Sequence, residues 1–116
     1  LAMCSLFLMD DDMNIMLDDS RKSPLYISGA DPELAYMVED KKAFVSSITP
    51  EEAMAAALEF NDLEGFLVSE KSAYTIATLL KNAASYTLDE TIVCIISGRP
   101  DKNWISACAE RMTVDE

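Results

Sequence analysis

An uncharged run of six residues, Thr91 to Ile96, most constrains how this chain can fold. Its sequence, Thr-Ile-Val-Cys-Ile-Ile, is rich in β-branched residues, which are enriched in strands. A strand that is apolar on both faces is typical of the interior of a parallel sheet covered by helices. The run therefore predicts a central strand, and Ser97-Gly98-Arg99-Pro100 ends it.

Helix and strand signals alternate in the part of the chain that leads to this run. Shorter strands are predicted at residues 43–48 and 66–68, and helices at about 49–64, at 72–84 and after Asp101. The order strand, helix, strand, helix, strand, helix over residues 43–116 implies right-handed crossovers. It predicts an α/β fold with a short, mostly parallel sheet flanked by about three helices.

The first of these helices has the clearest boundaries. Thr49 can cap its free N–H groups, Pro50 suits the first helical position, and Glu52 can complete a capping box. Gly65 is a natural stop. The predicted buried faces of the three helices are Ala53, Met54, Ala57, Leu58 and Phe60; Ala73, Ile76, Ala77, Leu80 and Ala83; and Trp104, Ile105, Cys108 and Met112.

Residues 1–42 are predicted to be largely loop, with a short N-terminal strand at Leu6–Met9 and a helical turn at Pro32–Met37. A loop of this length is unusual in a small free-standing domain and suggests a segment that packs across something larger. We therefore expect residues 1–116 to form either a single domain or a fragment of a larger one.

Composition narrows the possible functions. The formal net charge is −12, which disfavours binding to nucleic acid and to anionic membranes. The chain has no histidine and three cysteines without a CxxC pair, so no catalytic nucleophile pair and no metal site are expected. The cysteine usage fits a reduced, cytoplasmic setting. The apolar run Leu1–Met9 is far shorter than the ~20 residues of a membrane span.

A series of short motifs occurs in a fixed order along the chain. The motifs are Leu6–Ile15, Asp31-Pro32-Glu33-Leu34-Ala35-Tyr36, Val45–Ala53, Glu64-Gly65-Phe66 and Ile96-Ser97-Gly98-Arg99-Pro100-Asp101-Lys102. Their order and spacing resemble the C-terminal portion of one enzyme family, the tryptophan synthase β subunits, from about residue 6 to residue 104, nearly the whole chain.

The resemblance implies a fold type II enzyme that uses pyridoxal 5'-phosphate (PLP). In the family this enzyme is a lyase that joins L-serine and indole into L-tryptophan, with an α subunit as partner. A serine after the last core strand hydrogen bonds to the pyridine nitrogen of PLP, and Ser97 matches that serine. Ser97 and Gly98 are therefore the cofactor-binding residues that the resemblance implies, while no catalytic residue is carried over. Without the match, Ser97 is simply a turn residue at a strand end.

The chain departs from the family at several positions. The ungapped match places Lys71 where the family has a glutamate beside the cofactor, and Glu70 is one position away. Pro100 replaces a loop glycine, which removes a backbone N–H. The family's loop aspartate falls near Ser23-Pro24-Leu25-Tyr26, where no acid matches it.

The resemblance does not cover the family's Schiff-base lysine or its glycine-rich phosphate loop. The chain has only three glycines and no comparable stretch. We expect this chain alone not to bind PLP as an aldimine and not to make tryptophan. It would act instead with a missing N-terminal portion, or by self-association through apolar faces that such a portion would cover.

Two alternatives stay open. The chain is a non-catalytic remnant that acts as an interaction module, or it is an acidic α/β domain similar to a response-regulator receiver. The receiver hypothesis rests on Asp10-Asp11-Asp12 after an apolar strand, a pattern that can bind Mg²⁺. It needs a further aspartate after the strand at residues 44–48, where Thr49 stands instead. A solvated turn explains the triplet better.

Overall fold

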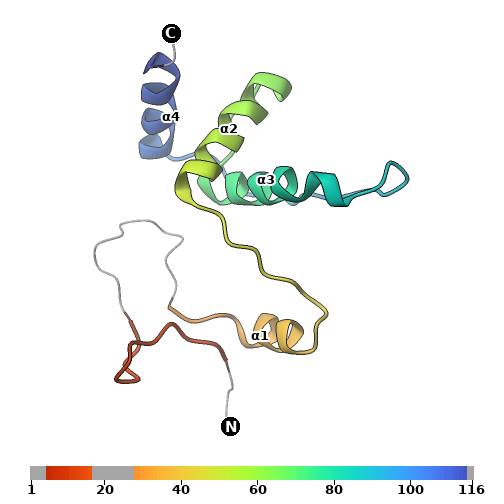
Figure 1. The fold of residues 1–116 in the computed structure, drawn as a ribbon. Coiled ribbons are helices and arrows are strands. Elements are labelled where there is room, and N and C mark those ends of the chain that lie inside the picture. The colour runs from red at the N-terminus through yellow and green to blue at the C-terminus, as the bar shows by residue number, and fades with distance from the viewer. Residues whose placement is uncertain (1–4, 17–27, 115–116) are drawn as a thin grey trace. The chain divides into compact units, whose positions relative to one another are not determined.

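The structure is a computed structural model that describes residues 5–16 and 28–114. Its elements, shown in Figure 1, are the helices α1 (Pro32–Glu39), α2 (Pro50–Glu64), α3 (Glu70–Asn82) and α4 (Lys102–Val114), with a short 3₁₀ helix η1 (Ala83–Ser85) after α3. The chain divides into two compact units, Leu1–Val45 and Ser46–Glu116.

Helix α2 begins and ends where the sequence predicts. The Glu52 backbone N–H donates to Thr49 Oγ1 at 3.2 Å, and the Thr49 N–H donates to Glu52 Oε2 at 2.7 Å. Pro50 occupies the first turn, and Gly65 ends the helix with a left-handed φ of 79°. The predicted capping box and the glycine stop are both confirmed.

Helices α3 and α4 are also capped by side chains. Helix α3 starts at Glu70, two residues before the predicted position, because Ser69 accepts a hydrogen bond from the Ser72 N–H. Asp101 Oδ1 accepts from the Trp104 N–H at 2.9 Å, so the predicted cap of the last helix is confirmed.

Small side chains make up most of the core of the second unit. Ala53, Ala57 and Ala73 have no exposed surface, which lets α2 and α3 pack closely. The complete buried cluster is Ala53, Ala56, Ala57, Val68, Ala73, Ile76, Ala77, Trp104 and Cys108. Two of the predicted core residues, Leu80 and Ala83, are instead exposed.

A hydrogen bond from Trp104 holds α4 against the segment before α3. Its indole Nε1 donates to the Val68 carbonyl at 3.0 Å, and the Trp104 side chain is buried. Cys108, one turn further along α4, is also buried, and this burial raises the pKa of its thiol. The predicted buried face of α4 is confirmed for these two residues and wrong for Ile105 and Met112, which are about half exposed.

The first unit is held together mainly by backbone hydrogen bonds. The Leu8 N–H donates to the Ser28 carbonyl at 2.8 Å, and the Ala30 N–H donates to the Leu6 carbonyl at 2.9 Å. Two isolated antiparallel bridges, Phe7 with Gly29 and Met9 with Ile15, accompany these bonds. Helix α1 follows, capped by the side chain of Asp31, and is longer than the predicted turn.

The predicted α/β fold is wrong. In residues 5–16 and 28–114 there is no strand beyond the isolated bridges, and the regular structure is helical. The segments at 44–48, 66–68 and 91–96 are connections between helices and not sheet strands. A strand is defined by pairing with a neighbour, and among the described residues no backbone group of Thr91–Ile96 hydrogen bonds to another segment. The five apolar residues after Thr91 predict an extended segment, but they do not supply a partner strand.

The predicted strand Phe66-Leu67-Val68 is instead a linker whose last residue belongs to the core. Val68 is buried, and its carbonyl accepts from the Trp104 indole and not from a neighbouring strand. Within the described part of the chain, no helix is both long and apolar enough to cross a membrane.

The capping box gives a stability prediction. Thr49→Ala removes the side-chain acceptor at the start of α2 and is expected to lower the free energy of unfolding by about 1 kcal/mol. Urea denaturation, monitored by circular dichroism, measures this change in free energy. Thr75→Ala, at an exposed position of α3, is the matched control and should not destabilise the chain. An equal loss in both variants would contradict a capping role.

The same cap predicts a pH dependence. Hydrogen bonds from the Thr49 backbone, then from Lys81 Nζ at 3.0 Å, lower the pKa of Glu52 below its usual 4.5. A carboxyl with a lowered folded-state pKa stabilises the fold above its unfolded pKa, and this contribution is lost as pH falls through the folded value. Glu52→Gln should therefore flatten the fall in unfolding free energy between about pH 6 and pH 3.

Glu51→Gln is the control for the pH experiment. Glu51 is the exposed neighbour of Glu52 and makes no hydrogen bond or ion pair with the described residues. If both glutamine variants flatten the pH profile equally, the cap does not cause the effect.

Candidate functional site

Ser97 is fixed through its backbone by two serines at the start of α3. Its N–H donates to Ser72 Oγ at 3.0 Å, and its carbonyl accepts from Ser69 Oγ at 2.7 Å and from Ser72 Oγ at 3.0 Å. Both anchoring side chains are buried, with 8% of Ser69 and 2% of Ser72 exposed. This serine cluster, Ser69, Ser72 and Ser97, therefore holds the end of the extended segment 91–96 against the beginning of α3.

The two buried hydroxyls pair with each other and with the Ser97 backbone. Ser69 Oγ also accepts the Ser72 N–H at 3.3 Å, so one hydroxyl both caps α3 and holds Ser97. Among the described residues no buried side-chain nitrogen or oxygen lacks a partner. Buried hydroxyls that are fully paired give a fixed geometry, because any movement leaves one of them unpaired.

The Ser97 hydroxyl takes no part in this network. The residue is exposed, and its Oγ makes no hydrogen bond within the described part of the chain. A hydroxyl can donate one hydrogen bond and accept others. The arrangement therefore presents a neutral hydrogen-bonding group on a backbone that is already fixed.

Gly98 turns the chain away from the cluster. Its φ of +74° lies in the left-handed region, which glycine adopts without strain. A Cβ built at Gly98 would lie 3.8 Å from Ser69 Oγ, an ordinary contact, so the backbone conformation and not space favours glycine here. Pro100, two residues further on, is partly buried. Its ring fixes the backbone φ and so stiffens the short connection to α4.

Both candidates for the family's glutamate lie in the first turn of α3. Glu70 begins the helix and Lys71 follows it, between the two anchoring serines in sequence. Lys71 is exposed. The structure therefore places either residue beside the serine cluster, but it gives the ungapped position a positive charge where the family has a negative one.

The residues of the cluster fit one edge of a PLP ring but not the complete cofactor. The Ser97 hydroxyl suits a ring nitrogen. A phosphate group needs several free N–H donors, yet at the start of α3 the N–H groups of Ser72 and Ala73 already bond to Ser69. The sequence contains no glycine-rich loop that could replace them. The described residues thus do not assemble a full PLP site.

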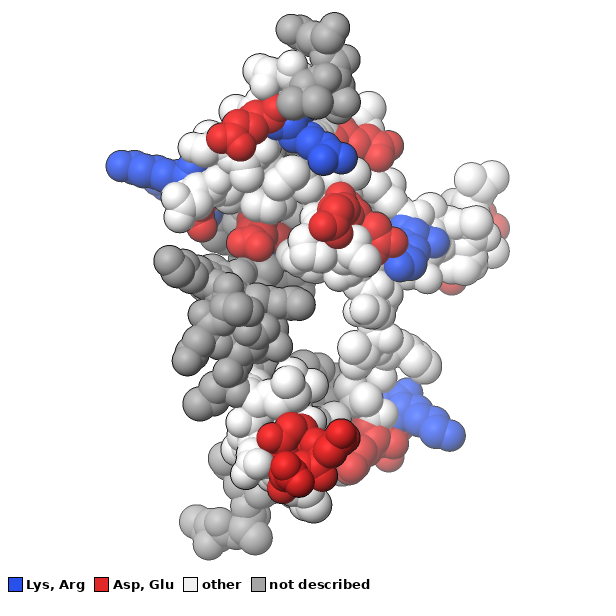
Figure 2. All heavy atoms as spheres, turned by 60° about the vertical axis from the view of Figure 1, so that its left-hand side comes forward, with Lys and Arg blue, Asp and Glu red and all other residues white. Residues whose placement is uncertain are grey.

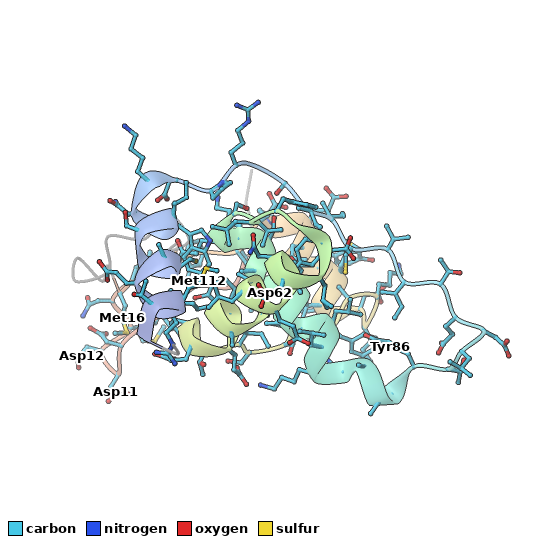
Figure 3. All side chains as sticks on the ribbon, turned by 90° about the horizontal axis from the view of Figure 1, so that it is seen from above. Asp11, Asp12, Met16, Asp62, Tyr86 and Met112 are labelled. Carbon is cyan, nitrogen blue, oxygen red and sulfur yellow. The ribbon has the colours of Figure 1, made fainter. Side chains whose placement is uncertain are left out.

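The acidic triplet forms a turn and not a metal site. Asp10 accepts hydrogen bonds from the Asn14 backbone and side chain and from the Asp12 N–H. These bonds, the Asn14 backbone first, lower the pKa of the Asp10 carboxyl. Asp11 and Asp12 point outward from the turn (Figure 3). No group of three His, Cys, Asp or Glu residues within 5–16 and 28–114 could hold a metal ion.

Figure 2 shows basic side chains that are scattered and not gathered into a patch on the face it presents. The loop at Ser23-Pro24-Leu25-Tyr26, where the family's aspartate would fall, lies outside the described residues.

Ser69 and Ser72 were missed in the sequence because the helix was predicted to start at Ser72. The signal that could have found them is the cap itself: Ser69 is followed by Glu70 and by an apolar helical pattern, as at many helix starts.

Substitutions at Ser72 and at Ser97 are predicted to change stability by different amounts. Ser72→Ala removes both bonds to Ser97 and is expected to cost about 1–2 kcal/mol of unfolding free energy. It should also speed hydrogen exchange at the Ser97 amide, because the N–H loses its acceptor. Ser97→Ala removes only the free hydroxyl and should stay within about 0.5 kcal/mol of the parent chain. NMR measures the exchange rate of the amide, and urea denaturation measures the unfolding free energy. Equal changes in the Ser72→Ala and Ser97→Ala variants would contradict the proposed anchoring.

Comparison with known proteins places these residues in a family context. No protein-family model matches the chain. Tryptophan synthase beta chain 1 of Methanosarcina acetivorans is 36% identical over 96 residues, which is 83% of this chain and 24% of that protein. Tryptophan synthase beta chains of Xanthomonas oryzae pv. oryzae and Xanthomonas campestris pv. campestris are 33% and 32% identical over the same share.

These matches confirm the predicted resemblance to tryptophan synthase β subunits. The chain spans about a quarter of the length of these relatives, as expected for one portion of such a protein. Over 83% of its length, this chain is homologous to tryptophan synthase beta chains.

Proposed function

We propose that this chain is one structural part of a tryptophan synthase β-like protein and that it is not catalytic by itself. In that setting Ser97 would supply a neutral hydrogen-bonding group to the pyridine nitrogen of PLP. The observation that carries the proposal is the geometry of Ser97: a backbone held by Ser69 and Ser72, and a hydroxyl left free. When bound, PLP would supply the electron sink for the replacement of the L-serine hydroxyl by indole.

Two observations support the proposal that the chain is not catalytic by itself. The chain spans 24% of its relatives, and its described residues offer PLP one ring contact without a phosphate cradle. The lysine that would carry the cofactor and the phosphate loop would then come from another portion. The free thiols of Cys94 and Cys108 support a reducing, cytoplasmic setting for this function.

A second candidate function is that of a non-catalytic interaction module. Large apolar side chains in both units favour it, because Phe44, Val45, Val93 and Ile95 are each more than three-quarters exposed. Exposed apolar surface of this kind marks protein–protein contact.

Addition of PLP to the chain tests whether it is catalytic by itself. We expect no absorbance band of a lysine aldimine, no product trapped by borohydride, and no tryptophan from L-serine and indole. A borohydride-stable adduct that maps to a single lysine would overturn this expectation.

Complementation tests the role of Ser97. The Methanosarcina acetivorans beta chain, truncated to remove the region that matches this chain, would be mixed with the present chain and PLP. We expect an aldimine band that neither portion gives alone. Ser97→Ala should shift this band, because the ring nitrogen loses its partner, and Ser106→Ala at an exposed position of α4 should not. No band in the parent mixture, or equal shifts in both variants, would contradict the proposal.

A further inference from the structure

A groove of about 450 Å³ lies between α2 and the last turn of α4, two helices that pack against each other in the second unit (Figure 1). A volume of this size falls within the roughly 300–1,000 Å³ that is typical of small-molecule sites. None of its lining residues belongs to the serine cluster, so the groove is separate from the candidate site. The lining residues are Pro50, Glu51, Met54, Ala55, Leu58 and Arg111.

One face of α2 forms the apolar side of this groove. Its lining residues recur at a spacing of three and four positions, which places them on the same face of the helix. Met54 and Leu58 are partly buried and pack against the core of the second unit, so their positions are supported from below. Glu51 and Leu58 lie seven positions apart, or about 10 Å along the helix axis. The groove therefore combines about two helical turns of apolar surface with a charged group in the first of them.

Two opposite charges line the groove without pairing. Glu51 stands in the first turn of α2, and Arg111 stands in the last turn of α4. Both residues are exposed, and neither side chain makes a hydrogen bond or an ion pair within the described part of the chain. The groove therefore offers a ligand one free carboxylate and one free guanidinium, on opposite helices.

These two charges determine which ligand complements the groove. A simple carboxylic acid would pair with Arg111 but would be repelled by the Glu51 carboxylate. A simple amine would pair with Glu51 but would be repelled by the Arg111 guanidinium. A ligand that carries both a carboxylate and an ammonium group pairs with both residues, and a guanidinium binds a carboxylate through two parallel hydrogen bonds. The complementary ligand is therefore a zwitterion with an apolar body.

We propose that this groove binds a free α-amino acid with an aromatic side chain. The ligand's carboxylate pairs with Arg111, its ammonium group pairs with Glu51, and its ring lies against Met54 and Leu58. The Met54 thioether favours an aromatic ring over an aliphatic chain, because contacts between sulfur and aromatic rings are attractive. The inference goes beyond the proposed function and does not depend on it, because no residue of the serine cluster takes part.

Titration with L-phenylalanine tests the proposal directly. NMR of the methyl groups of Met54, Ala55 and Leu58 should show shifts that saturate, with a dissociation constant of about 1 mM. A groove that stays unoccupied at ligand concentrations about tenfold higher, with no saturable shift at these methyl groups, would overturn the proposal.

Two analogues test the role of each charge of the ligand. Phenethylamine lacks the carboxylate, and 3-phenylpropionate lacks the ammonium group. Each should bind the parent chain about tenfold more weakly than L-phenylalanine, because one ion pair is lost and the uncompensated charge of the groove repels the remaining group. If all three ligands bind equally well, the ring alone is recognised and the proposed amino-acid site is wrong.

Substitutions in the groove should produce a crossed pattern. Arg111→Gln should weaken L-phenylalanine about tenfold and should leave phenethylamine no weaker than in the parent chain. Glu51→Gln should weaken L-phenylalanine by a similar factor and should leave 3-phenylpropionate no weaker. This pattern requires that each residue contacts its own group of the ligand, and a uniform loss for all three ligands would contradict it.

Matched controls separate the groove from the net charge of the chain. Arg99→Gln and Glu59→Gln change the net charge as the two groove variants do, but neither residue lines the groove. Both controls should bind L-phenylalanine within about twofold of the parent chain. The Trp104 indole N–H, which donates to the Val68 carbonyl, reports in the same spectra that each variant keeps the fold. A control that loses as much affinity as Arg111→Gln would refute the assignment.

Discussion

The close packing of α2 on α3 through alanines is the contact on which the rest of the second unit depends. Ala53, Ala57 and Ala73 let the two helices approach, and the linker between them is drawn into the same core by Val68. The Val68 carbonyl then holds Trp104, and the next residue, Ser69, holds Ser97. Helix packing therefore positions both the last helix and the candidate site.

The sequence predicted local features better than the way they assemble. The cap at Thr49, the stop at Gly65 and the cap at Asp101 are confirmed, because each depends on residues within one turn of the chain. The predicted sheet is wrong, because the five apolar residues Ile92–Ile96 predict an extended segment equally well with or without a partner strand. Trp104 and Cys108 were found in the core by helical spacing, whereas Leu80 and Met112 fit the same spacing and stay exposed.

For the candidate site, the match to the family selected Ser97, and the structure adds what the match could not. The anchoring bonds join residues 25 and 28 positions apart in sequence. No periodic pattern links residues at that distance, so Ser69 and Ser72 became visible only once α3 and the end of the extended segment were placed together.

The anchoring of Ser97 through backbone atoms alone has an evolutionary consequence. Every residue except proline has both an N–H and a carbonyl, so a different non-proline residue at position 97 keeps all three bonds to Ser69 and Ser72. Sequence drift can therefore alter the group displayed there without loss of the fold. A change at either buried serine breaks bonds that hold the segment, whereas a change at position 97 alters only the exposed group.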